Sequence, residues 1–389
     1  MKRAHILTYF ICHLIVSSNI AAQPVDFRGQ ASGWLSLNDA QPLQTNLGIR
    51  YIPSFYTGRA LGDAINLDIQ LSISGFNSTR YINADNYDSE WTLKPYRAWI
   101  RLSTNQFEAR VGLQKINFGS ATLFRPLMWF DQIDPRDPLQ ITDGVYSLLL
   151  RYYFLNNANI WLWGLYGNDD PKGWEVFPSD EESFEFGGRF QIPLLTGEIG
   201  ASYHHRQANI NSLIVAQMPP AMVGLMSGND HIVDENRFAV DGKWDAVVGI
   251  WAEAAATRQK SDYLPYGWRR SITIGADYTF DLGNGLSLLG EYFTSTTSEK
   301  MLGGGDGTQF LALSANYPLN LLDVASVILY VDVENDALYR FISWQRTYDH
   351  INLYLFGFWN PDDFNVYNNA DNANALAGKG FQIMLVYNH

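Results

Sequence analysis

The sequence predicts an all-β protein, a transmembrane antiparallel up-and-down β-barrel with about 18 strands, with 16 strands as the alternative. Nearly every strand-like segment places apolar residues on one side and polar or charged residues on the other. Short turns and longer loops alternate between these segments. The chain also begins with a segment that is typical of secretory signal peptides.

The N-terminal segment indicates export. Lys2 and Arg3 precede a short apolar run at 6–16, and Ala21 and Ala22 offer small side chains for cleavage before residue 23. We therefore expect a signal peptide at 1–22 and a barrel at 23–389. The only cysteine lies within the expected signal peptide, so the mature chain is expected to contain neither a disulfide nor a lipid anchor.

Composition is compatible with a barrel in lipid. The chain has a formal net charge of -13, which argues against a nucleic-acid partner. After the signal peptide, no apolar stretch reaches the roughly 18 residues that a membrane helix requires. Membrane-spanning strands alternate apolar and polar side chains, so the mean hydropathy of a sequence window does not reveal them.

The segment 65–74 shows the alternation clearly. Ile65, Leu67, Ile69, Leu71 and Ile73 share one face, and polar residues occupy every position between them. A period of two residues is expected of a strand between unlike environments. Repeated along the chain with whole charges on the polar face, the pattern indicates a closed sheet with lipid outside and water inside.

The same criteria place each element in order, with strands of roughly 9 to 11 residues. The expected strands begin near Phe27, Asn46, Ile65, Trp91, Phe107, Val145, Asn159, Ser183, Glu198, Arg237, Val247, Ser271, Leu286, Gln309, Leu322, Leu338, Ile351 and Gly380. The seventh, fifteenth and sixteenth are the irregular ones. Tight turns are expected at 103–105, 155–157, 194–197, 281–285 and 348–350. Longer loops are expected at 77–90, 119–144, 167–182, 207–236, 259–268, 296–307 and 360–379. An even strand count would bring both ends of the mature chain to the side of the tight turns.

Aromatic residues provide an independent indication. Outward-facing aromatics are expected at the tight-turn ends of the descending strands, at Phe154, Phe190, Trp244, Phe280, Tyr317 and Tyr387. Such a girdle marks a membrane interface. The alternative, a soluble β-sandwich or propeller, would have to accommodate the inward charges in its core.

The chain resembles the outer-membrane porins. The segment GLQKINFGSATLFRPLMWFDQIDPRDP, at 112–138, is similar to the strand and following loop of substrate-selective porins and alginate-export channels. The resemblance implies a bacterial outer-membrane location and a passive channel for small hydrophilic solutes. It also implies that the third outer loop, 119–144, folds into the lumen and narrows it.

The inward charges suggest what the constriction contains. The two-residue alternation of side chains places five charged residues on the lumen face of the fourth to sixth strands, namely Arg97, Arg101, Glu108, Arg110 and Arg151. The loop carries Asp131, Asp134, Arg136 and Asp137. A basic wall opposite an acidic loop would create a transverse field that selects solutes by charge and size. The same charges could instead form salt bridges that hold the loop, and the two interpretations are compatible.

Inward aromatics suggest sugar contacts. Trp34, Trp99, Tyr153, Trp251 and Phe293 are expected in the lumen, where an aromatic face can stack on a sugar ring. The alternative is that these side chains only fill space near the wall.

The sequence contains no catalytic motif, so no enzyme activity, cofactor or metal site is expected. Expected partners are outer-membrane lipid and lipopolysaccharide, small hydrophilic solutes or oligosaccharides, and a second copy in a homo-oligomer. Three functional alternatives remain. They are an exporter of an anionic polysaccharide, a structural or adhesive barrel plugged by loop 207–236, and a membrane-embedded hydrolase.

Overall fold

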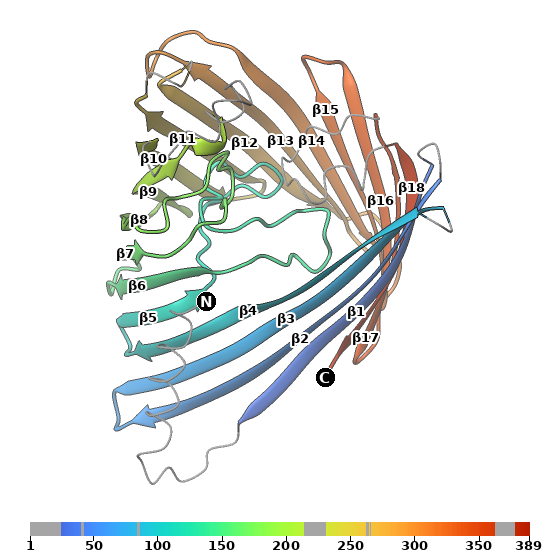
Figure 1. Cartoon of the computed structure of the whole chain (residues 1–389), viewed down its shortest axis with the longest axis horizontal. Helices are drawn as coiled ribbons and strands as arrows, with labels where there is room; N and C mark the ends of the chain where they lie inside the picture. The colour runs from blue at the N-terminus through green and yellow to red at the C-terminus, as the bar shows by residue number, and fades with distance from the viewer. Residues whose placement is uncertain are drawn as a thin grey trace.

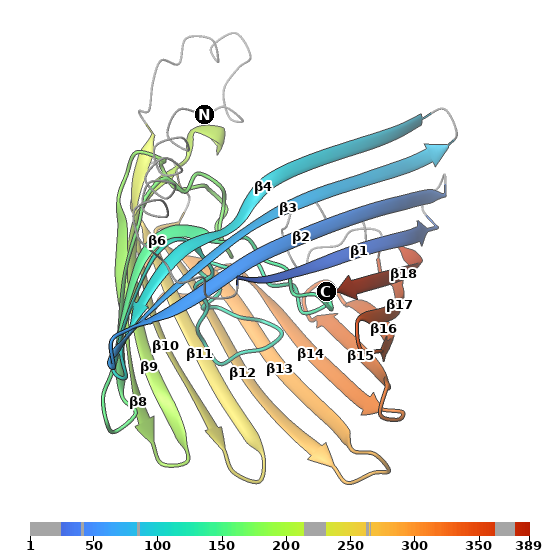
Figure 2. The same ribbon diagram turned by 90° about the horizontal axis from the view of Figure 1, so that it is seen from below.

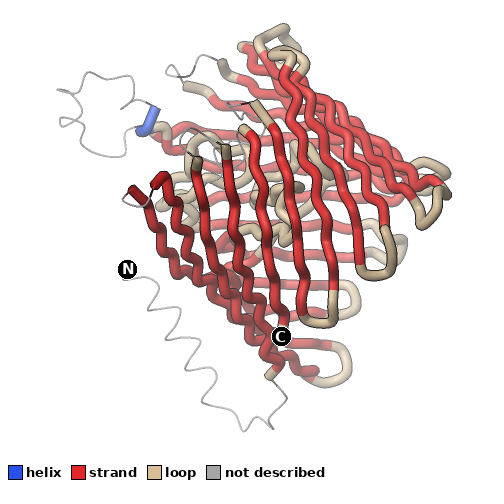
Figure 3. The backbone as a smooth tube through the Cα atoms, turned by 90° about the vertical axis from the view of Figure 1, so that its right-hand side faces the viewer, coloured by secondary structure: helices blue, strands red, loops and turns tan. Residues whose placement is uncertain are grey.

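The computed structural model describes residues 25–39, 43–83, 86–213, 231–261, 264, 266–361 and 378–389. These residues form 18 antiparallel strands of one sheet and a short helical turn at 211–213 (Figures 1 and 3). The strands are β1 (Asp26–Asn38), β2 (Gln44–Leu61), β3 (Ile65–Asn83), β4 (Asn86–Ser103), β5 (Phe107–Gln114), β6 (Val145–Tyr153), β7 (Asn159–Leu165), β8 (Glu185–Leu194), β9 (Gly197–Asn209), β10 (Ile232–Asp245), β11 (Gly249–Gln259), β12 (Trp268–Phe280), β13 (Leu286–Ser298), β14 (Gly307–Pro318), β15 (Asp323–Asp332), β16 (Ala337–Thr347), β17 (Ile351–Trp359) and β18 (Lys379–Asn388). The prediction of 18 strands is confirmed.

The sheet closes on itself. Each strand pairs with its neighbours in sequence, and β1 pairs with β18 from Gln30 opposite Asn388 to Asn38 opposite Gly380. Closure gives the first and last strands a partner on both sides, which is how a barrel removes sheet edges.

The connections sort by barrel end. At one end, β2–β3, β4–β5, β6–β7 and the following alternate pairs are joined by turns of two to five residues. The opposite end carries the long connections 115–144, 166–184, 210–231 and 360–378. Figure 2 shows the tight turns of β8–β15 along one rim. The described ends of the chain meet on the tight-turn side, where the backbone N–H of Gly29 donates to the carbonyl of His389 (2.9 Å).

The two faces of the wall differ as the alternation predicts. On β3, Leu71 and Ile73 are exposed on the outside, whereas Asp68 and Ser72 are buried inside. The expected outward aromatics at the tight-turn ends include Phe154, whose ring packs edge-to-face on that of Tyr152 at 4.9 Å. The outer surface is therefore an apolar belt.

One expected loop was wrong. The segment 77–90 is mostly strand, because β3 continues to residue 83 and β4 begins at residue 86. The register of β3 on β4 shifts between Ser72 and Ile73, which leaves Tyr96 as an extra residue on β4. Residues 77–90 carry mostly polar side chains on both faces, so this part of the hairpin lacks the apolar alternation by which the other strands are recognised.

Other expectations concern residues beyond the described ranges. The signal peptide at 1–22 lies outside them, as do residues 214–230 of the loop proposed as a plug. Within the described ranges, no helix has the length and apolar character needed to cross a bilayer.

Candidate functional site

The connection between β5 and β6, residues 115–144, is folded into the barrel, and we call it the inner loop (Figure 1). It carries many of the apolar side chains that the interior buries. One group, including Phe118 and Trp129, packs on Leu149 and Trp163 of β6 and β7. Another, including Phe124, packs on the opposite wall of β13–β16. The inner loop therefore crosses the lumen from one wall to the other.

Two wall carboxylates hold the backbone of the inner loop. Glu291 of β13 accepts hydrogen bonds from the N–H groups of Thr122 (2.7 Å), Leu123 (2.9 Å) and Phe124 (2.6 Å). The Trp251 indole N–H donates to the same carboxylate (3.0 Å). Carboxylates that accept several N–H groups form strong, charge-assisted bonds.

Glu253 of β11 is the second anchor. It accepts from the N–H groups of Ser120, Ala121 (2.7 Å) and Leu127 (3.1 Å). Gly119 lies against it with φ of +105°, and a Cβ at this position would come within 2.3 Å of Oε1 of Glu253. Glycine is required here both by the backbone conformation and by the close approach of the carboxylate.

The β7–β8 loop, residues 166–184, covers the inner loop. The indole N–H of Trp174 donates to the carbonyl of Arg125 (2.7 Å). Gly173 has φ of +52°, and a Cβ there would approach the carbonyl oxygen of Met128 to 1.7 Å. The two loops are therefore in close contact.

Buried ion pairs fix the β7–β8 loop to the wall. Glu175 contacts Arg237 of β10 (2.6 Å) and Arg206 of β9 (3.2 Å), while Lys172 contacts Glu185 of β8 (3.1 Å). All five side chains are buried. Removing one partner of such a pair leaves an uncompensated buried charge, which is strongly destabilising.

Three of the arginines predicted to face the lumen pair with carboxylates of the barrel wall. Arg101 pairs with Asp68 (2.8 Å) of β3, and Arg110 pairs with Glu108 (2.9 Å). Arg151 lies 3.8 Å from the same Glu108 and stacks on the Trp161 ring. The three arginines therefore form a continuous network with Asp68 of β3 and Glu108 of β5.

Arg97 and Lys94 of β4 reach the inner loop directly. Arg97 donates to the carbonyl of Thr142 (2.9 Å), and Lys94 pairs with Asp143 (2.6 Å). Sequence reasoning had placed Arg97 on the lumen face, and this contact agrees with that placement.

The acidic residues of the inner loop have mostly local partners. Asp131 is buried against Arg125 (2.8 Å), and Asp134 pairs with Arg136 (2.6 Å). Burial raises the pKa of Asp137, although the N–H groups of Leu139 (3.0 Å) and Ile141 (3.2 Å) partly offset this by donating to it.

The larger lumen cavity has a volume of about 920 Å³ and lies between the inner loop, β1–β4 and β14–β18. Its charged lining residues are Arg50, Arg80, Glu90, Lys94, Arg125, Asp134, Arg136, Asp137 and Asp143. Asp131 is not among them. The cavity therefore has a mixed charge, with Asp134, Arg136 and Asp137 on its loop side.

The five expected lumen aromatics have different environments. Trp34 lines the larger cavity, and Trp99 lies under the guanidinium of Arg110 at 4.8 Å. Trp251 is buried and donates a hydrogen bond to Glu291. The ring of Phe293 stacks on that of Phe124, with 5.0 Å between the ring centroids. Tyr153, at the tight-turn end of β6, is exposed.

Comparison with known proteins addresses the fold. No family model and no curated protein matches the chain. OccAB1 of Acinetobacter baumannii is 10% identical, with a TM-score of 0.57 over 96% of this chain and 98% of that chain. Salmonella typhi OmpF, solved with daunomycin, is 14% identical, with a TM-score of 0.50 over 94% and 97%. The chain has a porin fold.

Another structure with this porin fold is OmpT, an outer membrane protein of Vibrio cholerae in a trimer form. It is 12% identical, with a TM-score of 0.51 over 94% of this chain and 99% of that chain. At these identities the likeness concerns the architecture alone.

Sequence reasoning missed the two anchors of the inner loop. The alternation of their strands gives Glu253 and Glu291 inward positions, but it cannot assign their partners, because backbone N–H groups carry no residue-specific signal. The one available hint was an inward glutamate without an inward cation next to it on the same strand.

Proposed function

We propose that the protein is a passive outer-membrane channel for small hydrophilic solutes, in which the inner loop forms the constriction. The observation that carries the proposal is the fixed position of this loop. It crosses the lumen between two hydrophobic clusters, and the carboxylates of Glu253 and Glu291 bind its backbone. A cavity lined by charged and polar side chains remains beside it.

The charges of this cavity favour selection by size and dipole over a strong preference for one ion. Both cations and carboxylates line it, and a narrow aqueous gap with low-dielectric sides strengthens their field. The pairing of Arg101, Arg110 and Arg151 with carboxylates supports this proposal over export of an anionic polysaccharide, which would need a continuous unpaired basic path.

Single-channel recording of the purified protein in planar bilayers tests the proposal. We expect stable steps of conductance, together with swelling of proteoliposomes in small sugars and exclusion of larger oligosaccharides. An absence of current from correctly folded protein would contradict the channel and favour a plugged barrel. Solute passage without chemical change would agree with the expectation of no enzyme activity.

A further inference from the structure

Neighbouring strands end at different heights at the rim that carries the long loops, and loops cover most of the steps between them. β9 extends beyond β8, and there the β7–β8 loop bonds to its edge. The N–H of Asp180 donates to the carbonyl of Gln207 (2.9 Å), and the N–H of Asn209 donates to the carbonyl of Pro178 (2.9 Å).

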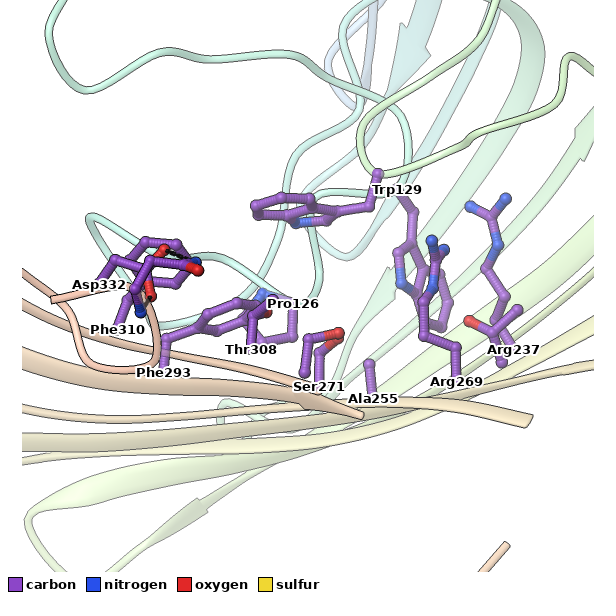
Figure 4. A pocket seen from close by; sticks show the side chains of 14 residues that line it. Pro126, Trp129, Arg237, Ala255, Arg269, Ser271, Phe293, Thr308, Phe310 and Asp332 are labelled. Carbon is purple, nitrogen blue, oxygen red and sulfur yellow. Dashed lines mark hydrogen bonds between the residues drawn. The ribbon is translucent and has the colours of Figure 1, made fainter. Parts of the chain in front are cut away.

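The inner loop faces the wall of β11 and β12 in a similar way. Pro126 and Trp129 of the inner loop lie opposite Ala255 and Ser271 of these strands, across a cavity of about 420 Å³ (Figure 4). This part of the wall therefore has loop residues next to it.

The step between β4 and β5 is different. β5 pairs with β4 only from Ala98 to Ser103, so the part of β4 from Asn86 to Arg97 has β3 as its one partner among the described strands. Figure 2 shows this part of β4 at the margin of the sheet. Within the described ranges, no loop backbone bonds to it. We call residues 87–93 of β4 the free edge.

The ladder shows which backbone groups point to the free edge. Gly29 and His389 exchange both of their N–H···O bonds (2.9 and 3.0 Å), which makes them a hydrogen-bonded pair of β1 and β18. Continued through the registers of β1 to β4, this alternation places the bonds between β3 and β4 at residues 88, 90, 92 and 94 of β4. The residues between them direct their N–H and carbonyl groups away from β3, and these are Tyr87, Ser89, Trp91 and Leu93. Pro95 follows in the same alternation and has no N–H to pair, as is typical of a strand edge.

The free edge is in contact with solvent. The side chains of Tyr87, Trp91 and Leu93 are 61%, 75% and 76% exposed. A tilted crossing of roughly 9 to 11 residues that starts at Ser103 ends near Leu93, so residues 87–91 lie at or beyond the membrane surface. Unpaired backbone groups are not tolerated in hydrocarbon, and this agrees with a position in water.

The side chains of the free edge are acidic on one face. Asp88 and Glu90 alternate there, and neither has an ion pair among the described residues. On the other face, Trp91 and Leu93 are apolar. A row of unpaired N–H and carbonyl groups is a template for another strand, because only an extended polypeptide offers the complementary groups at the same spacing.

We propose that the free edge is a docking site for an extended segment of another polypeptide, which adds to the sheet as an antiparallel strand. Its backbone bonds to Tyr87, Ser89, Trp91 and Leu93. Basic side chains of the segment lie beside Asp88 and Glu90, and apolar side chains lie beside Trp91 and Leu93. This interaction does not depend on conduction through the lumen.

Dye-labelled peptides test the docking by fluorescence anisotropy, with the folded chain in a neutral detergent. The probe is a seven-residue peptide of alternating valine and lysine, and its acidic counterpart carries glutamate in place of lysine. We expect the basic peptide to bind about tenfold more tightly than the acidic one. Equal binding of the two would overturn the role of the carboxylates, and no binding of the basic peptide would overturn the proposal.

N-methylation of the probe distinguishes strand addition from contact through side chains. In antiparallel addition, the valines lie opposite residues 87, 89, 91 and 93, so their N–H groups bond to the free edge. Methylating the valine nitrogens should weaken binding at least about tenfold, whereas methylating the lysine nitrogens should change it little. Equal effects of the two modifications would overturn strand addition.

Variants test the edge itself. Ser89→Pro removes an N–H from the free edge and should weaken binding about tenfold. Ser89→Ala is the matched control, because it retains the N–H and loses only the hydroxyl contacts with Asn77 (3.2 Å) and Thr79 (3.0 Å). Binding that is unchanged in Ser89→Pro would overturn the proposal. Should this variant fail to fold, the pair of methylated peptides provides the same test.

The acidic face has a control of its own. Asp88→Asn combined with Glu90→Gln should weaken binding of the basic peptide, and Asp349→Asn should not, because Asp349 lies in the tight turn between β16 and β17 at the opposite rim. Equal losses in the two proteins would overturn the assigned charge contacts.

Light scattering identifies the other possible occupant, a second copy of the chain. A wild-type oligomer that dissociates in Ser89→Pro, without any binding of peptide, would assign the free edge to contacts between copies and overturn the proposal. Single-channel current is expected from the wild type and from Ser89→Pro alike, so a failure of the docking site leaves the channel proposal standing.

Discussion

At the scale of single residues, alternation decides the effect of a substitution. Ile69 lies on the outer face of β3, and its neighbour Gln70 points inside, where its amide donates to the Ser54 hydroxyl (2.9 Å). Adjacent positions of one strand therefore face an apolar belt and the lumen.

We expect Ile69→Arg to lower the free energy of unfolding by about 2 to 4 kcal/mol, because it moves a charge into hydrocarbon. Gln70→Arg should cost far less. Urea titration of both variants folded into phospholipid vesicles measures the difference. Equal losses would show that the two faces are not lipid and water.

The second residue-scale prediction concerns an anchor of the inner loop. Glu291→Gln replaces one acceptor oxygen with a donor, so either the Thr122 N–H on Oε1 or the Leu123 and Phe124 N–H groups on Oε2 lose their acceptor. We expect a loss of about 2 to 3 kcal/mol in the free energy of unfolding and a noisier single-channel current. Glu198→Gln, at an exposed position beside a tight turn, is the control. A quiet channel in the Glu291 variant would mean that the hydrophobic clusters alone hold the loop.

At the scale of elements, the inner loop combines a fixed half and a half that borders the larger cavity. Residues 120–130 are bound by the two glutamates and the hydrophobic clusters. Residues 132–138 line the cavity. Altering the second half should therefore change permeation with little effect on the first.

Deleting 134–137 should raise single-channel conductance, because these residues occupy lumen space next to the larger cavity. Single-channel recording at a fixed salt concentration measures the conductance. The unfolding midpoint of the deletion variant shows whether it is folded. An unchanged conductance in a folded deletion variant would place the narrowest point elsewhere.

Neutralising Arg101 and Arg110 together should shift the ion selectivity toward cations, because Asp68 then loses its counter-charge and Glu108 retains only Arg151. Reversal potentials under a salt gradient measure this shift in selectivity. The shift occurs only if the charged network lies within a Debye length, about 8 to 10 Å, of the permeating ion. A purely structural role predicts instead a loosened wall with an unchanged reversal potential.

At the scale of the whole molecule, the even strand number and the β1–β18 closure bring both described ends of the chain to one rim. If this rim faces the periplasm, the loops of the opposite rim face the outside of the cell.

An epitope inserted at Gly304, where a Cβ meets no atom within 4 Å, should be reached by antibody on intact cells. The same epitope inserted after Asn320, in the turn between β14 and β15, should be reached only after the outer membrane is opened. The reverse labelling pattern would invert the topology.

The wall of the barrel follows from the sequence. Outward and inward faces require different side chains at every second position, so the strands, their turns and the inward charges can be read from local pattern alone. The exceptions are instructive. Residues 77–90 are mostly polar on both faces, and the local pattern therefore predicts a loop where the hairpin of β3 and β4 continues.

What fills the barrel follows from contacts that form when the chain folds. The inner loop follows no period, and its position depends on contacts with residues more than a hundred positions away, such as Glu253 with Ala121 and Glu291 with Phe124. Likewise, no local rule shows that Arg237 is paired twice and Arg269 is not. Pairing between inward charges depends on which strands and loops the closed barrel brings together, and that arrangement exists only after the chain has folded.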